Sequence, residues 1–270
     1  MPLSFLHAAS RKSAARVASV AIPVALVLFC ASAAAFGPHA HALVAAHAQQ
    51  ELTPQAAREV KRLLGAIGAR SMVEVASWAD ENRDKTTARW HYINFPAGNC
   101  HYERKRDCPD GNCLIEAIRT QRTILADRQR SDIARGEALR YIIHLVGDAH
   151  QPLHSGRYAD RGGNRYQINI DGEGSNLHRL WDSGLSRYLP NLRKDVLDAA
   201  PLGAKLEGPV AWTEASCRMV NKPGFYPSHK PSPKYLHWAA GVYRQQIELA
   251  GDRLAMLLNQ VLAGKSPKRG

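Results

Sequence analysis

The stretch that decides the fold runs from Glu137 to His150 and reads EALRYIIHLVGDAH. Its length and apolar content predict a mostly buried helix, which ends before Pro152 because proline lacks the N–H that a helix interior requires. His144 and Asp148 are spaced i and i+4, so they lie on one face of that helix, one turn apart. An imidazole and a carboxylate in apolar surroundings need a partner that offsets their desolvation. A metal ion provides such a partner, and so does a His–Asp hydrogen bond within the core.

Further histidines and aspartates occur on both sides of this stretch. The run NLHRLWD, residues 176–182, repeats the spacing and places His178 and Asp182 one helical turn apart. Four more candidate ligands are His41, Asp80, His91 and His154. Neutral imidazole and carboxylate groups suit zinc and related metals. Because four such residues fill one site, the larger set indicates more than one metal ion.

The remaining sequence predicts an all-α domain that is mostly helical, with one small β-hairpin. Thr53 and Pro54 are typical of an N-cap and a first helical position, and an apolar stripe from Ala56 to Ile67 follows them. Residues 166–170 alternate before Asp-Gly-Glu-Gly, which predicts a short hairpin. Other helices are expected at residues 38–48, 71–80, 113–131, 176–181 and 233–263, with loops at 94–113, 155–164 and 221–233.

Residues 1–35 have the features of a secretory signal peptide. Basic residues precede the apolar stretch Val17–Phe29, whose 13 residues are fewer than a bilayer crossing needs. Small residues follow up to Ala35, where we expect cleavage, so the mature domain is residues 36–270 and is secreted or periplasmic. An uncleaved membrane anchor is the alternative. Lipidation of Cys30 is disfavoured, because Phe29 is larger than the residue that normally precedes a lipidated cysteine.

Cysteine content and charge also fit an exported protein. Outside the signal the cysteines are Cys100, Cys108, Cys113 and Cys217. An even number predicts two disulfides; a cysteine-based zinc site is the alternative, which the absence of a C-x-x-C spacing disfavours.

The formal charge is +12, and without the three basic residues of the signal it is +9. A chain this basic is attracted to polyanions such as nucleic acid or anionic lipid.

Three runs taken together resemble the S1/P1 nuclease family and, more distantly, the zinc-dependent bacterial phospholipases C. They are HLVGDAHQPLH (144–154), DRGGN (160–164) and NLHRLWD (176–182). The resemblance follows the family order from Phe36 to the final helix, so it covers nearly the whole predicted domain. It implies the mostly helical phospholipase C/P1 nuclease fold, with three zinc ions in one cleft.

The resemblance also implies which residues bind each zinc ion. Carried over by position, the first zinc would be bound by Asp80, His91, His144 and Asp148, and the second by His154, His178 and Asp182. The third would take His41, Asp148 and the α-amino and carbonyl groups of Phe36. The family usually has Trp at that first mature position, but backbone ligands do not require an indole. The implied disulfides are Cys100–Cys217 and Cys108–Cys113.

The activity implied is hydrolysis of RNA and single-stranded DNA to 5′-phosphate products, together with removal of 3′-phosphates from nucleotides. Asp80 would be catalytic, binding its zinc and orienting the attacking water. Tyr92 falls at a position that is aromatic in the family, where a ring stacks on a base; core packing is its alternative role. Asn94 falls where some relatives have Asp, so base preference would differ. Asn164 would contact phosphate or base, and a turn is its alternative role.

Two rival functions follow from the same residues. One is a phospholipase C-like phosphodiesterase acting on lipid headgroups, and the other is a secreted, non-catalytic protein stabilised by zinc.

We expect a monomer with no stable protein partner, and no membrane association after signal cleavage. The run Arg104–Arg106 is expected to be a solvated loop, with contact to a nucleic acid backbone as its alternative role. The histidines that match no ligand position are His39, His47, His101, His150, His229 and His237, with His150 expected behind the ligands or at the surface.

Overall fold

The computed structural model of the chain describes Met1 and residues 36–203 and 205–263. The predicted signal peptide, beyond Met1, and its cleavage point after Ala35 lie outside the described residues. The described residues from Phe36 onward belong to one compact unit. Its α-helices are α1 (Pro38–Gln50), α2 (Pro54–Ala66), α3 (Trp78–Glu81), α4 (Arg104–Asp107), α5 (Leu114–Ala126), α6 (Asp132–His150), α7 (Leu177–Asp182), α8 (Leu192–Leu197), α9 (Pro209–Val220) and α10 (Pro233–Leu262).

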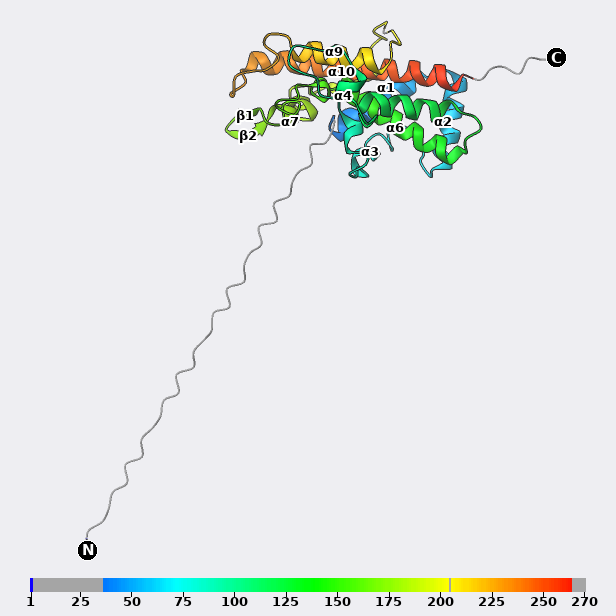
Figure 1. Cartoon of the computed structure of the whole chain (residues 1–270), viewed down its shortest axis with the longest axis horizontal. Coiled ribbons are helices and arrows are strands. Elements are labelled where there is room, and N and C mark those ends of the chain that lie inside the picture. Colours follow the sequence, from blue (N-terminus) through cyan, green and yellow to red (C-terminus); the bar gives the residue numbers. More distant parts are fainter. Residues whose placement is uncertain (2–35, 204, 264–270) are drawn as a thin grey trace, which may run out of the picture. The chain divides into compact units, whose positions relative to one another are not determined.

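Short 3-10 helices and one hairpin complete the described secondary structure. The 3-10 helices are η1 (Ala88–His91), η2 (Pro152–Ser155) and η3 (Gly184–Tyr188). Strands β1 (Gln167–Ile170) and β2 (Glu173–Asn176) pair antiparallel, with Gln167 opposite Asn176 and Ile170 opposite Glu173. The predicted all-α architecture with one small hairpin is therefore confirmed (Figure 1).

The long helices begin at polar caps that the sequence supplies. Thr53 accepts a hydrogen bond from Ala56 N–H at the start of α2, and Ser131 accepts one from Ala134 N–H at the start of α6. Ser232 does the same for α10. Each cap satisfies one of the N–H groups that a helix start leaves unpaired, and contributes about 1 kcal/mol.

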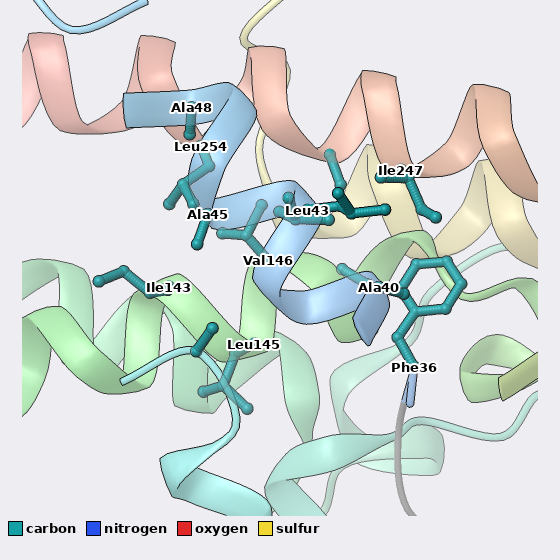
Figure 2. Close-up of a cluster of buried hydrophobic side chains, with 14 of the residues drawn as sticks. Phe36, Ala40, Leu43, Ala45, Ala48, Ile143, Leu145, Val146, Ile247 and Leu254 are labelled. Carbon is teal, nitrogen blue, oxygen red and sulfur yellow. The ribbon is translucent and has the colours of Figure 1, made fainter. Parts of the chain in front are cut away.

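Helix α6 lies at the centre of the core, with α1 and α10 packed against it. Figure 2 shows α1 between α6 and α10, with Leu43, Val146 and Leu254 among the side chains that fill the space. All three are buried, and each such side chain contributes about 2 kcal/mol through removal of its surface from water. The polar face of α6 is thereby fixed in position by apolar contacts on its other sides.

Three of the predicted helix boundaries are wrong. Residues 72–77 form turns, and only α3 is helical in the predicted 71–80 segment; in these turns the carbonyl of Ala76 accepts a hydrogen bond from the His144 ring. Helix α5 ends at Ala126 rather than at 131. Helix α6 begins at Asp132, five residues before the predicted start, because Ser131 caps it. Helices α8 and α9 were not predicted, and α4 interrupts the predicted loop at 94–113.

Both disulfides join the partners that the family resemblance implied. Cys100 is bonded to Cys217 on α9, and Cys108 to Cys113 at the start of α5. The cysteine-based zinc site is therefore wrong for these four residues. Disulfides are typical of proteins in oxidising compartments. Among the residues described, none of the helices combines the length and apolar character that crossing a bilayer requires.

Candidate metal centre

The inner face of α6 carries a fully buried imidazole and carboxylate. His144 and Asp148 are both 0% exposed, and His144 Nε2 lies 3.3 Å from Asp148 Oδ2. The i, i+4 spacing on one helix produces this proximity. The pair is in contact and is also surrounded by further ligand-type side chains, so the geometry is compatible with both alternatives, a His–Asp pair and a metal site.

A first group forms where α3 and η1 approach α6. His91 Nδ1 lies 3.3 Å from Asp80 Oδ1 and 3.1 Å from His144 Nε2. His144 Nε2 lies 3.7 Å from Asp80 Oδ1. One ligand atom from each of these three residues falls within 4.8 Å of the others, which is the arrangement that can hold a metal ion. Helix α3 is only one turn long, so Asp80 is positioned by packing rather than by a long helix.

A second group forms from η2 and α7. His154 Nε2 lies 3.8 Å from Asp182 Oδ1, and His178 Nε2 lies 3.5 Å from Asp182 Oδ2. The two imidazole rings stack with centroids 5.1 Å apart. Gln151, at the start of η2, donates a hydrogen bond of 2.6 Å to Asp182 Oδ1, and its own side-chain oxygen accepts from Leu153 N–H. This glutamine fixes the orientation of the carboxylate.

A third group is completed by His41 on α1. Its ring stacks on His144 with centroids 3.9 Å apart, and its Nε2 lies 3.4 Å from Asp148 Oδ1. Gly147 makes this approach possible, because a Cβ atom there would be only 2.8 Å from His41 Nδ1. Asp148 Oδ1 is also 3.4 Å from His154 Nδ1. Asp148 therefore stands at the junction of the three groups.

Phe36 anchors the start of the described domain beside these groups. Its ring is 0% exposed and meets Tyr243 edge-on at a centroid distance of 5.4 Å. The same ring lies 6.2 Å from the ring of His41. The next residue, Gly37, donates its N–H to the carbonyl of Asp182 at 2.7 Å. The backbone of this segment is thus tied to α7, which carries the second group.

Backbone carbonyls orient three of the imidazole rings. His144 Nδ1 is 2.8 Å from the carbonyl of Ala76, and His178 Nδ1 is 2.7 Å from that of Gly162. His154 Nδ1 is 2.6 Å from the carbonyl of His91. A ring N–H that donates to a carbonyl leaves the other nitrogen, Nε2, as the lone-pair donor. Metal-binding histidines are normally held by such a hydrogen bond.

Burial sets the protonation states of these groups. It lowers the pKa of His154 to about 3, and it lowers the pKa of His41 and His178 as well. Burial opposes ionisation of Asp148, but the adjacent His144 and His154 outweigh it and lower the Asp148 pKa well below the usual value. Burial raises the pKa of Asp182 well above its usual value. Burial opposes protonation of His144, but the adjacent Asp148 outweighs it and raises the His144 pKa to about 9. Zinc takes neutral imidazoles and ionised carboxylates as ligands, so its binding would release the protons that His144 and Asp182 hold.

The hydrogen bonding of the cluster is incomplete without a cation. Neither ring nitrogen of His41 has a hydrogen-bond partner among the described residues, although both are buried. The same is true of His91 Nε2 and Asp148 Oδ1. Buried polar atoms left without partners cost about 1–3 kcal/mol each. The residues present therefore fit a group of bound metal ions.

These side chains are called the inner cluster below: His41, Asp80, His91, His144, Asp148, His154, His178 and Asp182. The structure brings together all eight of the side chains predicted as ligands, with three metal-compatible groups among them. Of the histidines that match no ligand position, His150 is buried rather than at the surface, because its ring contacts the carbonyl of Val146 and the guanidinium of Arg253. His47 is buried against Asp252, outside the cluster.

A cavity of about 1030 Å³ opens beside the inner cluster. His91, His154 and His178 line it, and so do the three predicted substrate contacts, Tyr92, Asn94 and Asn164. Tyr92 is 37% exposed, so its alternative role in core packing is wrong.

Asn164 lines the cavity and also belongs to a turn. Its side chain donates to the carbonyl of Arg161.

Sequence reasoning missed one aromatic residue and several arginines in the cavity wall. They are Tyr158, Arg83, Arg89, Arg161 and Arg165. The run Arg104–Arg106, expected to be a solvated loop, forms α4, and Arg106 lines the cavity while paired with Asp107 and Glu103. The sequence signals for this wall were the basic charge of the chain, the run Arg104–Arg106 and the DRGGN run, which contains Arg161.

Known proteins resemble this chain over most of the described domain. A family model described as S1/P1 Nuclease matches residues 36–263. Nuclease P1 of Penicillium citrinum is 36% identical over 162 residues, which cover 57% of this chain and 58% of that protein. Endonuclease 3 of Arabidopsis thaliana is 33% identical over 265 residues, which cover 85% of this chain and 90% of that protein. The chain thus spans somewhat over half the length of nuclease P1 and most of the length of endonuclease 3.

Proposed function

The chain belongs to the S1/P1 nuclease family, and on that premise we propose that it is a zinc-dependent phosphodiesterase that cleaves RNA and single-stranded DNA. Its products carry 5′-phosphates, and it also removes 3′-phosphates from nucleotides. The observation that carries the proposal is the set of three His/Asp groups, buried except for Asp80, beside one cavity. The arginines in the wall of that cavity favour a polyanionic substrate.

Each group of the inner cluster is assigned to one zinc ion. Asp80, His91, His144 and Asp148 would hold the first, and His154, His178 and Asp182 the second. His41 and Asp148 would hold the third, together with the amine and carbonyl of Phe36 once cleavage after Ala35 has freed that amine. When bound, zinc supplies Lewis-acid charge beside the phosphate and lowers the pKa of a water molecule to about 7.

Asp80 is the acid best placed to orient the attacking water. Its side chain is 15% exposed, whereas the side chains of Asp148 and Asp182 are 0% and 6% exposed. Among the three, Asp80 therefore combines contact with the ligand histidines and the greatest exposure to solvent. General-base and water-orienting groups contribute about 10²–10⁴-fold to rate.

Tyr92, Asn94 and Asn164 provide the contacts that select an unpaired strand. Tyr92 offers a half-exposed ring on which a base stacks, and a base is available for stacking only where the strand is not duplex. Asn94 both donates and accepts hydrogen bonds, so it can contact a base edge that an aspartate would not. Asn164 lies across the same cavity, where its amide can contact phosphate or base.

One assay separates the proposed nuclease from its two rivals. The purified, zinc-loaded protein is incubated with single-stranded DNA and, separately, with phosphatidylcholine vesicles. We expect cleavage of the DNA with 5′-phosphate ends. Cleavage of the lipid alone would favour the phospholipase C-like enzyme, and no hydrolysis of either would favour the non-catalytic protein.

Export, processing and oligomeric state complete the proposal. The protein is proposed to be secreted or periplasmic and monomeric, with Phe36 as its first residue. The two disulfides support an oxidising compartment. N-terminal sequencing of the exported protein tests the cleavage site, and light scattering of the same sample tests the monomer.

A further inference from the structure

Tyr158 exposes an aromatic ring in the wall of the cavity. It is 76% exposed, twice as much as Tyr92, and it lines the same cavity as His154 and His178. An aromatic ring left in water lacks the favourable burial that such rings normally have in a folded protein. An exposed ring beside a candidate active centre is therefore a candidate contact for a ligand.

The backbone holds Tyr158 in a fixed place relative to the inner cluster. The segment that carries Tyr92 and Asn94 runs beside it: Ile93 N–H donates to the carbonyl of His154, and Tyr158 N–H donates to that of Phe95. Tyr158 is four residues from His154, so their Cα atoms lie at most about 14 Å apart. That separation is within the length of a short oligonucleotide.

Side-chain contacts behind the loop make it rigid. The guanidinium of Arg157 lies over the ring of Tyr226 at 4.2 Å, and Tyr226 donates to Asp160 Oδ2 at 2.6 Å. Asp160 Oδ1 accepts from Gly163 N–H. Tyr158 therefore has little conformational freedom to lose at its backbone when a ligand binds.

Arg161 occupies an unfavourable backbone conformation in the same wall. Its φ is +54°, in the left-handed region that a side chain with a Cβ rarely adopts. The next residue, Gly162, packs so closely that a Cβ there would be 2.3 Å from the carbonyl of Leu153. The exposed Arg161 lines the cavity and forms no ion pair with any residue that the structure describes. Such strain is often found at functional sites.

We propose that Tyr158 and Arg161 form an outer subsite for a second nucleotide of the strand, in addition to the nucleotide at Tyr92. The ring of Tyr158 stacks on its base, and the guanidinium of Arg161 binds its phosphate. This inference rests on the proposed nuclease function. Its consequence is that oligonucleotides bind better than 3′-mononucleotides, which are too short to reach both rings.

The first test compares two substrates in three variants. For each protein, KM is measured for a single-stranded hexanucleotide and for a 3′-mononucleotide. The ratio of the hexanucleotide KM to the mononucleotide KM is taken, so that effects common to both substrates cancel. Tyr158→Leu should raise the ratio about tenfold, because stacking on the ring is lost. Tyr158→Phe should leave it within about twofold, since the ring remains. Trp238→Leu removes an exposed aromatic outside the cavity and should not change the ratio.

The second test uses two glycine substitutions that relieve the same backbone strain. Arg161→Gly removes the proposed phosphate contact, whereas Asp171→Gly removes a side chain at φ +55° in the turn of the hairpin. The logarithm of hexanucleotide KM is measured against the logarithm of salt concentration. Arg161→Gly should reduce the slope by about 0.7, the value for one phosphate contact on a single strand. Asp171→Gly should leave the slope unchanged.

The outcomes separate this inference from the function on which it rests. If the unaltered protein cleaves neither substrate, the proposed nuclease function is wrong. If it cleaves both, and Tyr158→Leu leaves the KM ratio unchanged, the outer subsite is wrong while the nuclease function stands. An unchanged salt slope in Arg161→Gly would overturn the phosphate contact.

Discussion

The inner cluster and the rim of the cavity lie side by side but are held in different ways. The rim is defined here as Tyr92, Asn94, Tyr158, Arg161 and Asn164. The inner cluster is built mostly from buried side chains, and backbone carbonyls orient three of its rings. Both ring nitrogens of His41, together with His91 Nε2 and Asp148 Oδ1, have no hydrogen-bond partner among the described residues. The rim consists of exposed or half-exposed side chains. Changes in the inner cluster should therefore cost both stability and activity, and changes in the rim should cost affinity alone.

Removal of metal should give the largest effect, because it leaves the whole inner cluster uncompensated. Dialysis against a chelator should abolish hydrolysis of single-stranded DNA and lower the Tm by about 10 °C, since a ligand at 1,000 times its Kd stabilises a protein by about 4 kcal/mol. Calorimetry and an activity assay measure the two effects. Added zinc should restore both, and an unchanged Tm would contradict the assignment of the cluster to metal.

Single substitutions within the inner cluster should separate catalysis from stability. His154→Ala removes a buried ligand and should abolish activity with a clear fall in Tm. Asp80→Asn retains the shape of a partly exposed side chain and should lower kcat by about 10³-fold, with a smaller change in Tm. Near wild-type cleavage by Asp80→Asn would disprove its role in orienting water.

A residue behind the ligands should give an intermediate effect. Gln151→Leu removes the hydrogen bond to Asp182 and should reduce zinc affinity or activity by about 10–100-fold. Competition with a chromogenic chelator measures the affinity. Gln151→Glu is the matched variant: it keeps the size of the side chain but places a second acid against the carboxylate. Wild-type affinity in Gln151→Leu would show that the hydrogen bond does not orient Asp182.

At the rim, loss of a ring should weaken binding without loss of fold. Tyr92→Leu should raise KM for single-stranded DNA about tenfold while the Tm stays within about 2 °C, because the side chain is half-exposed and makes a stacking contact only with substrate. Tyr92→Phe should behave like the unaltered protein. A large fall in Tm in Tyr92→Leu would mean that Tyr92 belongs to the core.

The smallest effect is expected away from both regions, at the ion pair between α2 and α6. Hydrogen bonds from Arg62, and then from Arg135, lower the pKa of Glu59 to about 2. Because this value lies below that of the unfolded chain, the pair stabilises the fold above about pH 4.5 and loses that contribution as the pH falls toward 2. Glu59→Gln should therefore lower the free energy of unfolding slightly at pH 6 and not at pH 2. Urea titrations at the two pH values measure the difference.

The inner cluster was largely predictable from sequence, and so were Tyr92, Asn94 and Asn164 of the rim, whereas Tyr158 and Arg161 were not predicted as contacts. His144 and Asp148 attract notice because an apolar helix buries two polar groups at i, i+4 spacing, and His178 and Asp182 repeat it. Tyr158 and Arg161 belong to a Gly-rich loop without periodicity. Only the pairing of this loop with the segment around Phe95 turns them toward the cavity.

The errors in secondary structure have a related cause. Residues 71–77 were predicted to be helical, but 72–77 form turns in which the carbonyl of Ala76 accepts a hydrogen bond from the distant His144 ring. Tertiary context of this kind routinely overrides helix propensity. Helix α9 carried a recognisable signal in Gly208 followed by Pro209, which is a common start for a helix. Its position against η2 and the disulfide to Cys100 still required the tertiary structure.

The central claim is that the inner cluster binds a set of zinc ions and that the bound ions are required for phosphodiester cleavage. Elemental analysis of the purified, exported protein, made on the sample used for N-terminal sequencing, tests it most directly. We predict Phe36 as the first residue and about three zinc ions per chain, with reduced zinc in Asp148→Asn. A protein that contains no zinc and still cleaves single-stranded DNA at the full rate would contradict the claim.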